Sequence, residues 1–469
     1  MTQFVLAIII SIAVLVFLIV KLNVHPVISL FVGGMLCGSI LGNSPLTTIT
    51  TIANGFGSTL GSIGMTIIFG SIIACSIRDS GAAKSMVNFF IKLFRGKNLE
   101  LSTGMAAYIM SIPVFGDVTM VLISPLCAII SKRQNKPMGL MASMTILPLN
   151  LTHSMVPPTP GILAVSVLLG ADLGLVILWG IVCSLIAYLL TWVLMRGWAA
   201  KDYYPPKPEY IEGVEEAKSD DYHDLLIQEE GLPNVLAAMS PILLPVILIA
   251  LASFADMTMA EDDSIRIFLD IIGARNIAMF IGVICGWLLA VSHKEKTLAN
   301  YNQTSGKSEK SLFQMMFNGW VSEALEVALI PLIVTGFGGG FAQIIKDAPA
   351  ATQLGDVVAA TGFPGFLVPF VIGAAMECAV GSRTTAGMTA AGLCLPMLDS
   401  LGISPVACAV MIGAGTMIVS HVNDSGWWVS MSMFNMDAPR TFKYNTLVGG
   451  IAGVFAGIAG IVFIMLGVM

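Results

Sequence analysis

The feature that most constrains this chain is a recurring series of apolar runs, each long enough to cross a lipid bilayer as a helix. Residues 4–20, 175–195 and 446–466 are three of these runs, and a spanning helix needs about 20 apolar residues for about 30 Å of hydrocarbon. Only 11% of the residues are charged, whereas a soluble domain carries about 25%. The sequence therefore predicts an all-α polytopic membrane protein. It excludes a soluble enzyme, a nucleic-acid binder and a disordered scaffold.

Other features narrow the function further. Residues 1–20 have no basic segment and no small-residue cleavage site, so we expect no secretory signal peptide. The 8 cysteines fall in apolar stretches, which predicts buried small side chains rather than disulfides or a metal site. Because no Walker, GxGxxG, HExxH or EF-hand pattern occurs, we expect no cofactor, no resident metal and no ATP-driven pump.

The chain repeats itself at an offset of 268 residues, the separation of Phe69 from Phe337. Segment 69–83 matches segment 337–351 at seven of fifteen positions, and the same offset places His153 on His421. The chain has only 5 histidines, so apolar composition does not explain the alignment of two of them. We therefore expect an internal duplication.

Clusters of Lys and Arg indicate how the two repeats are oriented, because short cytoplasmic loops collect basic residues. Such clusters flank segment 101–131 on both sides. This segment is therefore predicted to enter and leave on the cytoplasmic face as a re-entrant hairpin with its tip at residues 115–117. Counting spans between basic loops places Asp79 inside and its equivalent, Asp347, outside. The two repeats are predicted to have inverted topologies.

Each half is predicted to hold three spanning helices, a re-entrant hairpin, a broken helix and a final span, which gives about ten spans and two hairpins. The first repeat covers residues 1–198 and the second covers 235–469, and the polar stretch 199–234 joins them as a cytoplasmic linker. The predicted segments are 4–20, 26–43, 57–78, 101–131, 138–171 and 174–196, then 236–254, 277–293, 320–346, 365–398, 404–436 and 445–468.

Inverted repeats with interrupted helices are typical of secondary transporters, whose substrate site lies near the midplane between the halves. Non-helical backbone at that depth must line a water-filled cavity or be buried in protein. Four interruptions are predicted, and each combines freed backbone groups with hydroxyl or ionisable side chains. They lie at residues 113–117, 153–161, 381–385 and 420–426.

Charged residues in these interruptions are candidates for function, since ionisable groups inside membrane segments are rare and costly. Arg383 can pair with a substrate carboxylate through two hydrogen bonds, or it can form a structural ion pair with Glu377 or Asp424. Asp117 can bind a proton or a sodium ion, or it can cap the second arm of the first hairpin.

Polar residues of the two broken helices add further candidates. His153 and His421 occupy equivalent positions, and imidazole titrates in the range that a proton symporter uses; either ring can instead be a hydrogen-bonding strut. Asn423, Asp424 and Ser425 offer an amide, a carboxylate and a hydroxyl, which suit a polyhydroxylated ligand. The candidates for proton coupling are Asp117, His153, His421 and Asp424.

Four segments resemble the gluconate permease family, and the likeness extends from about residue 4 to the C-terminus. They are 55–64 (GFGSTLGSIG), 112–118 (IPVFGDV), 152–161 (THSMVPPTPG) and 420–428 (SHVNDSGWW). The resemblance implies a bacterial inner-membrane proton symporter for gluconate or a related sugar acid, in a family that also includes D-serine permeases. It further implies the homodimeric elevator architecture of the ion transporter superfamily.

Three positions depart from the family pattern. Thr159 stands where the family usually has His, Gly116 where it has an aromatic residue, and Thr385 where it has Val. Each departure lies in a segment expected to contact ligand. The fold prediction is unaffected, and the identity of the substrate stays open.

The predicted mechanism is elevator transport, in which broken polar elements move together against a fixed scaffold. The scaffold helices are expected within 4–43 and 236–293, and the transport elements within 57–171 and 320–436. The expected partners are a carboxylate substrate, a coupling proton, the lipid bilayer and a second copy of the chain. The predicted substrate-site residues are Phe115, Gly116, Asp117, His153, Thr159, Ser382, Arg383, Thr384, Thr385, His421, Asn423, Asp424 and Ser425.

Other functions remain as alternatives to a proton-coupled importer of a hydroxylated monocarboxylate. A permease for D-serine or another small hydroxy or amino acid, or a sodium-coupled carboxylate transporter, fits the same pattern. A passive channel would need a continuous polar stripe along several helices, whereas polarity here is concentrated at four interruptions. A membrane enzyme would need a nucleophile–base pair or metal-ligand spacing, and only the two histidines with Asp117 and Asp424 offer a metal set.

Overall fold

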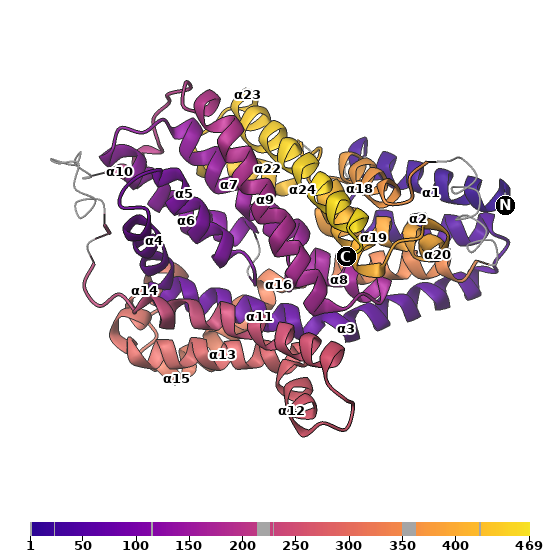
Figure 1. Ribbon diagram of the computed structural model, residues 1–469, viewed down its shortest axis with the longest axis horizontal. Coiled ribbons are helices and arrows are strands. Elements are labelled where there is room, and N and C mark those ends of the chain that lie inside the picture. Colours follow the sequence, from indigo (N-terminus) through magenta and orange to yellow (C-terminus); the bar gives the residue numbers. More distant parts are fainter. Residues whose placement is uncertain are drawn as a thin grey trace.

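The computed structural model describes residues 2–22, 24–113, 116–212, 226–227, 229–348, 363–421 and 424–469 (Figure 1). Within these ranges the regular elements are helices and no strand occurs. The first half contains α1 (Thr2–Val20), α2 (Pro26–Ile40), α3 (Pro45–Asp79), α4 (Ala82–Leu93), α5 (Leu99–Met110), α6 (Gly116–Arg133), α7 (Met138–Met155), α8 (Pro160–Leu169), α9 (Leu173–Ala199) and the short α10 (Pro208–Ile211).

The described residues of the second half form helices as well. It contains α11 (Val235–Thr258), α12 (Ser264–Gly273), α13 (Arg275–Ser292), α14 (Lys294–Ser305), α15 (Leu312–Gln314), a π-helix (Met315–Gly319), α16 (Trp320–Lys346), α18 (Leu367–Val380), α19 (Arg383–Cys394), a 3-10 turn (Leu395–Met397), α20 (Leu398–Leu401), α21 (Pro405–Gly415), α22 (Ser425–Met433), α23 (Ala438–Thr441), a second π-helix (Phe442–Leu447) and α24 (Val448–Met465).

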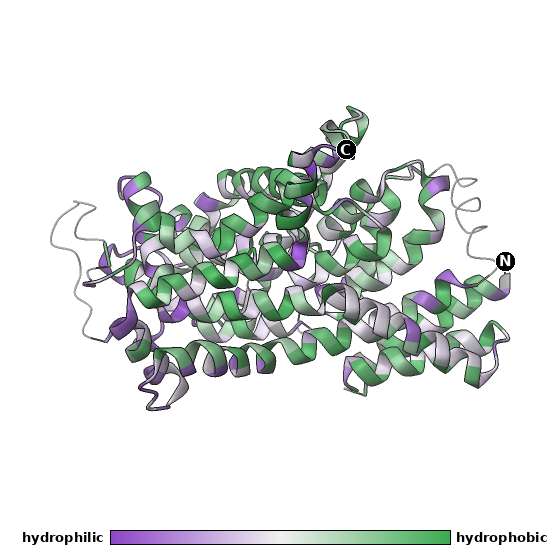
Figure 2. Cartoon of the chain, turned by 90° about the horizontal axis from the view of Figure 1, so that it is seen from below, coloured by the Kyte–Doolittle hydropathy of each residue, from purple (hydrophilic) through white to green (hydrophobic). Residues whose placement is uncertain are grey.

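The surface of the bundle is apolar. Among the described residues, 6 helices are long and apolar enough to cross a membrane. Large side chains such as Phe17, Val193 and Leu288 are exposed on the outer helices, and Figure 2 shows hydrophobic colour along most of the helical surface. Such surfaces face lipid, and all backbone hydrogen bonds of a helix are made internally, as the bilayer requires. The chain is therefore a multi-pass membrane protein.

The long helices α3 and α16 pack closely along each other. Glycine permits the approach, because a Cβ atom added at Gly55 would lie 2.7 Å from the carbonyl oxygen of Gly339. Farther along the contact, Gly64 faces Leu332. Residue numbers therefore rise on α3 while they fall on α16, so the two helices are antiparallel.

Helices of the second half recur at the positions that the 268-residue offset predicts. The arms α5 and α6 correspond to α18 and α19, and the broken pair α7–α8 corresponds to α21–α22. The last helix α9 corresponds to α23–α24, and α3 corresponds to α15–α16. Because α3 and α16 are equivalent and antiparallel, this pair supports the predicted inversion of the repeats.

Some boundaries differ from the predicted segments. Helix α3 starts at Pro45 rather than at residue 57, because Ser44 caps it by accepting the N–H of Thr47 at 3.1 Å. Its polar first turns satisfy themselves, since Thr48 and Thr50 donate their hydroxyl protons to carbonyls four residues earlier. The structure also forms α4, α12 and α14 in stretches where the sequence analysis predicts only connections.

The helix interruptions have local causes. Pro157 and Pro158, which are joined by a cis peptide bond, separate α7 from α8 because proline cannot donate a backbone hydrogen bond. Gly381, with φ of 69°, ends α18 in the left-handed conformation that glycine tolerates. Ser382 then caps α19 by accepting the N–H of Thr385. Each interruption thus leaves a helix end directed into the protein interior.

Candidate functional site

Three of the four interruptions meet in the interior of the protein. A Cβ atom added at Gly161, in α8, would lie 3.2 Å from the Cα of Thr384, at the start of α19. Gly413, in α21, lies against the carbonyl of Ser154, near the end of α7. The first hairpin is joined to the same region, because the hydroxyls of Ser111 and Thr152 are hydrogen-bonded.

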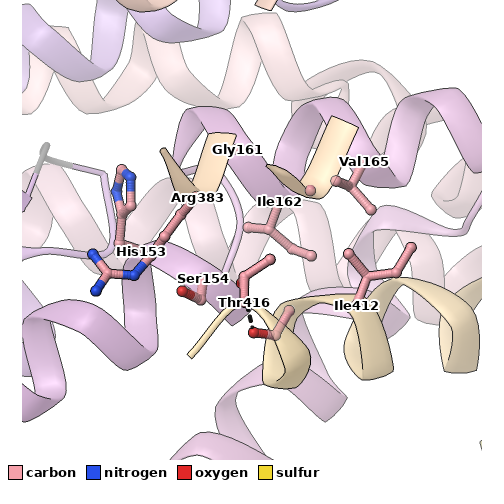
Figure 3. A pocket seen from close by; sticks show the side chains of 10 residues that line it. His153, Ser154, Gly161, Ile162, Val165, Arg383, Ile412 and Thr416 are labelled. Carbon is pink, nitrogen blue, oxygen red and sulfur yellow. Dashed lines mark hydrogen bonds between the residues drawn. The ribbon is translucent and has the colours of Figure 1, made fainter. Parts of the chain in front are cut away.

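A small cavity lies at this meeting point (Figure 3). Its volume of about 10 Å³ corresponds to roughly one water molecule, so a ligand larger than water can enter only when the surrounding elements separate. The side chains of His153 and Arg383 lie beside each other at one end of it. The cavity is lined by His153, Ser154, Gly161, Ile162, Val165, Arg383, Gly387, Ile412, Gly413 and Thr416.

Arg383 is buried at the first position of α19, and the described residues engage only part of its donor capacity. Its Nη1 lies 3.4 Å from Oδ2 of Asp424, and the two side chains are 8% and 7% exposed. Its Nε is buried and has no hydrogen-bond partner among the described residues. The structural ion pair that the sequence analysis considered is thus formed with Asp424, and a planar guanidinium still has donors free for a second carboxylate.

Asp424 caps the helix α22. Its Oδ1 accepts the N–H of Gly426 at 2.9 Å, and its Oδ2 accepts the hydroxyl proton of Ser420 at 2.5 Å. With the Arg383 ion pair, both carboxylate oxygens of Asp424 are engaged. Asp424 therefore positions Arg383 and holds the start of α22.

The two equivalent histidines have different surroundings. The ring of His153 lines the cavity, and its Nδ1 is buried without a hydrogen-bond partner among the described residues. His421 is partly exposed, and its Nε2 lies 2.9 Å from the carbonyl oxygen of Cys378. His153 thus faces the cavity, whereas His421 ties the second broken helix to α18.

The predicted hydroxyl residues mainly form hydrogen bonds within the protein that hold the backbone around the site. Thr159 is fully buried, and its hydroxyl donates to the carbonyl of Val156 at 2.8 Å. The hydroxyls of Ser382 and Thr385 are hydrogen-bonded to each other at 3.2 Å. Thr384 is the hydroxyl residue of this group that lies against Gly161 of the cavity.

Some predicted site residues lie outside what the structure describes. Phe115 and Asn423 fall outside the described residues. Gly116 begins α6, and Asp117 and Ser425 lie in α6 and α22, but the side chains of Asp117 and Ser425 are likewise outside the description. Their roles remain predictions.

Comparison with known proteins places this architecture in a family. The model of the GntP family permease matches residues 3–466. The chain belongs to the GntP permease family. Its resemblance to gluconate permeases, first seen in the segments around the interruptions, is confirmed over almost the whole chain.

Curated relatives of this family member are transport proteins. It is 27% identical to a gluconate permease of Pseudomonas aeruginosa over 455 residues, which cover 96% of this chain and 94% of that protein. It is 26% identical to the Gnt-II system L-idonate transporter of Escherichia coli, with 95% of this chain and 97% of that protein covered. It is 30% identical to the D-serine transporter DsdX of Escherichia coli, with 95% of each chain covered. These relatives are permeases and transporters, not enzymes.

A solved structure confirms the type of fold. The YdaH transporter of Alcanivorax borkumensis, whose topology is described as unusual, superposes with a TM-score of 0.51 at 16% identity and covers 89% of this chain and 88% of its own. At this identity the similarity concerns the fold alone. This permease therefore shares an all-helical transporter architecture with it.

Sequence reasoning gave too little weight to one residue of the site. Glu377 lies in the last turn of α18, is fully buried and has no hydrogen-bond partner for either carboxylate oxygen among the described residues. The sequence analysis considered it only as a structural partner of Arg383. The signal was available, because Glu377 is the single ionisable side chain besides Cys378 in the apolar stretch 367–380, and such residues are functional by default.

The chemistry that the site offers follows from these groups. Among the described residues no three His, Cys, Asp or Glu side chains converge as a metal site would require. The site presents a guanidinium with free donors, a helix N-terminus at α19, an imidazole and two carboxylates. This set can bind an anion and can exchange protons.

Proposed function

We propose that this permease is a secondary transporter that imports a small hydroxylated monocarboxylate, gluconate or a related sugar acid, together with a proton. The observation that carries the proposal is Arg383. A buried guanidinium with unused donors at the N-terminal end of a helix, beside a cavity between broken helices, suits a carboxylate. Relatives named as gluconate and idonate transporters support the substrate class.

A second candidate is D-serine or another small amino acid. The relative with 30% identity is named as a D-serine transporter. The acidic side chains of Asp424 and Glu377 accompany Arg383 in the site, and such a pairing of charges also suits a zwitterion. Counterflow in proteoliposomes, with gluconate, idonate, four-carbon sugar acids and D-serine as competing substrates, separates the two candidates. Transport of none of these compounds would contradict the proposal.

Arg383 supplies the first test of the site. Replacing it with alanine (R383A) should abolish carboxylate uptake and weaken binding by at least about 30-fold, since losing one partner of a buried charge pair costs about 2–5 kcal/mol. Substrate binding to purified protein and uptake into proteoliposomes measure this. The matched control is R196A, which removes an arginine that stacks on Trp192 in α9, away from the cavity.

The outcome that would exclude Arg383 is equally clear. If R383A binds gluconate with near-normal affinity while R196A behaves as wild type, Arg383 is not the anion partner. Backbone N–H groups at the interrupted helix ends would then be the remaining candidates. Expression and elution volume in detergent show whether each variant is folded.

Coupling to protons is favoured over coupling to sodium. The titratable side chains His153, Glu377 and Asp424 gather around the cavity region, and such groups can carry a coupling proton. Uptake should be driven by an inward pH gradient without sodium, and a protonophore should abolish it. Sodium-dependent uptake that ignores the pH gradient would favour the sodium-coupled alternative.

The elevator mechanism is part of the proposal and is supported by an asymmetry between the halves. In the second half, α19 packs against α16, and a Cβ atom at Gly338 would lie 3.3 Å from the Cβ of Met388. The equivalent residues of the first half are Gly70 and Met120, but Gly70 instead lies against the carbonyl of Pro113. Two repeats with the same elements but different packing are what an elevator held in one of its end states would show.

The packing also suggests which helices stay fixed. Helix α3 packs on α2 and α13, and α16 packs on α2 and α3. We therefore assign α3 and α16 to the scaffold, although the sequence analysis placed 57–78 and 320–346 among the transport elements. We further propose a homodimer in the bacterial inner membrane, as the resemblance implies, which mass measurement of the detergent-solubilised protein tests.

A further inference from the structure

Glu377 is a buried acidic group that no hydrogen bond from the described residues compensates. It lies in the last turn of α18, four residues before Gly381, whose N–H donates to the Glu377 carbonyl at 2.8 Å. Its exposure is 0%, and both carboxylate oxygens lack a hydrogen-bond partner in the described part of the chain. The other buried carboxylates differ, since Asp79 accepts from Trp320 and Arg78.

An unpaired carboxylate in this position is unfavourable in its charged form. Burying an ionised group without hydrogen bonds costs several kcal/mol. The C-terminal end of a helix adds to this cost, because the partial negative charge of its free carbonyls repels a carboxylate. Glu377 therefore either holds a proton or, when ionised, depends on a nearby cation. Which of the two forms is favoured can change when the surroundings of Glu377 change.

The charged neighbours of Glu377 come from the hairpin and the second broken helix. Arg383, at the start of α19, and Asp424, at the start of α22, are the two charges that act on it most directly. Of the elements packed on α18, α21 brings only Cys408 as a titratable side chain, α19 adds Cys394, and α1 brings none. Around this cluster, His421 bonds the Cys378 carbonyl of α18, and His153 faces Arg383.

We infer that Glu377 is the proton-binding group that couples substrate uptake to the pH gradient. This inference rests on the proposed function and deepens it. Glu377 takes a proton from water on the side to which the site is open, and releases it to water on the other side. In the loaded state Arg383 keeps its Asp424 partner and offers the substrate carboxylate the donors, such as Nε, that have no partner among the described residues, while Glu377 stays neutral.

The charges of the cluster explain the coupling. With Glu377 ionised and no substrate, one guanidinium and two carboxylates carry a net charge of −1. With Glu377 protonated and a substrate carboxylate bound, the net charge is again −1, so the two forms that cross the membrane are alike. Substrate without the proton would give −2, and an additional buried charge of this kind opposes binding and movement.

The first repeat does not carry this cluster. The positions equivalent to Glu377, Arg383 and Asp424 in the first half are Ile109, Phe115 and Val156. The first hairpin thus has apolar residues where the second has charges. A pair of charges that only one of two equivalent hairpins carries is more consistent with a role in transport than with folding.

The experiment measures proton uptake on substrate binding. Purified wild-type protein in weakly buffered detergent solution should take up about one proton per bound gluconate at a pH where Glu377 is ionised. Its apparent Kd should rise about tenfold per pH unit above the titration point of the group. E377Q carries a neutral side chain at all pH values, so it should bind with a pH-independent Kd and take up no proton. In proteoliposomes it should exchange substrate but no longer accumulate it in response to a pH gradient.

Matched variants decide between Glu377 and its neighbours. E100Q changes another buried glutamate, whose carboxylate accepts from Trp192 at 3.0 Å, and it should keep the wild-type proton uptake. If E377Q still takes up a proton or accumulates gluconate, or if H153Q alone abolishes the proton uptake, the inference is wrong. A folded E377Q that binds no substrate at any pH also contradicts it, because a neutral side chain should favour the binding form.

These outcomes are separate from a failure of the proposed function. If wild-type protein binds and transports none of the sugar acids or D-serine, the substrate proposal fails before Glu377 is tested. If the wild type transports with sodium and takes up no proton, proton coupling fails as a whole. The assignment of Glu377 by itself is rejected when the wild type is proton-coupled and E377Q is unaffected or folded but unable to bind substrate, or when H153Q alone abolishes the proton uptake.

Discussion

At the scale of single residues, ionisable groups sort by how completely the fold provides them with partners. In the interior, Arg383 and His153 keep nitrogen atoms without partners among the described residues. Near the linker the opposite holds, because Glu229 contacts two ammonium groups, those of Lys84 at 2.5 Å and Lys296 at 2.6 Å. Arg383 and His153 thus have unpaired nitrogen atoms, within the described residues, where a ligand is expected, whereas Glu229 joins the linker to α4 and α14.

The Glu229 contacts give a prediction about stability and pH. Burial acts to raise the carboxyl pKa of Glu229, but hydrogen bonds from Lys296 and Lys84 outweigh it and hold the pKa below its ordinary value. A lowered folded-state pKa adds stability above the unfolded pKa of about 4.3, and this stability is lost as the pH falls through the folded value. E229Q should therefore lower the thermal midpoint by about 1–2 °C at pH 7, and the difference should be smaller at about pH 4, below the unfolded pKa.

The control for this prediction is the neighbouring residue. Glu230 contacts Lys296 only through its backbone carbonyl, at 3.0 Å, so E230Q should leave the thermal midpoint unchanged at both pH values. An E229Q midpoint equal to wild type at pH 7 would mean that the two ion pairs contribute no net stability. Thermal unfolding in detergent, followed by intrinsic fluorescence, supplies the measurement.

At the scale of elements, glycines decide how closely the long helices approach. A Cβ atom at Gly55 would lie 2.7 Å from the Gly339 carbonyl and 2.8 Å from the Cβ of Gln343. Gly57, one half-turn away on the same helix, has no heavy atom within 4 Å of the position of a Cβ. The same residue type therefore serves packing at one position and has no steric requirement at the other.

This contrast predicts opposite effects of the same substitution. G55A should destabilise the protein by about 1–3 kcal/mol, because α3 and α16 must move apart. G57A should be neutral or stabilising by up to about 1 kcal/mol, because alanine favours an exposed helix over glycine. The thermal midpoints of the two purified variants test this, and a G55A protein as stable as G57A would show that the contact yields easily.

Much of the element pattern could be predicted from the sequence, for physical reasons that differ among elements. The interruption at Pro157 and Gly161 was predictable because proline and glycine determine backbone geometry locally. Helices such as α4 were not predicted, because a short amphipathic helix has no long apolar run that would identify it in the sequence. The ion pair of Arg383 with Asp424 could be stated only as one of two alternatives, since it depends on the packing of segments 41 residues apart.

The candidate site residues also differ in whether the sequence alone could predict their role. Thr159 was expected to contact ligand because it replaces a family histidine, but its hydroxyl donates to the backbone at the end of α7. Glu377 received too little weight because the sequence does not reveal whether a partner reaches it. Local conformation follows from residue type, whereas the partners of a side chain follow from tertiary packing.

At the scale of the whole molecule, the proposed mechanism rests on the symmetry of the two repeats and on the contacts in which they differ. The pair Gly338–Met388 is in contact, and its equivalent in the other repeat is made of the same two residue types, Gly70 and Met120. In an inverted-repeat elevator the second state is obtained by exchanging the conformations of the repeats. If the permease is the elevator proposed above, Gly70 and Met120 should come into contact when the site opens to the other side of the membrane.

Paired cysteines in a background without native cysteine test this exchange. G338C/M388C should form a disulfide in this state, since the two Cβ atoms would be 3.3 Å apart, and a shift of a few tenths of an ångström brings them into the range of about 3.5–4.5 Å found in disulfides. G70C/M120C should cross-link only in the opposite state. G33C/L15C, within the scaffold at 3.6 Å, should link in both.

If the halves instead rock as rigid bodies, the pair G338C/M388C lies within one half and would link equally in both states. A cross-half pair, G64C/L332C on α3 and α16, would then change with state. An elevator requires the reverse: G338C/M388C should link in only one state, and G64C/L332C should link equally in both. The four cross-linking patterns therefore decide between sliding of the transport elements and rocking of the halves.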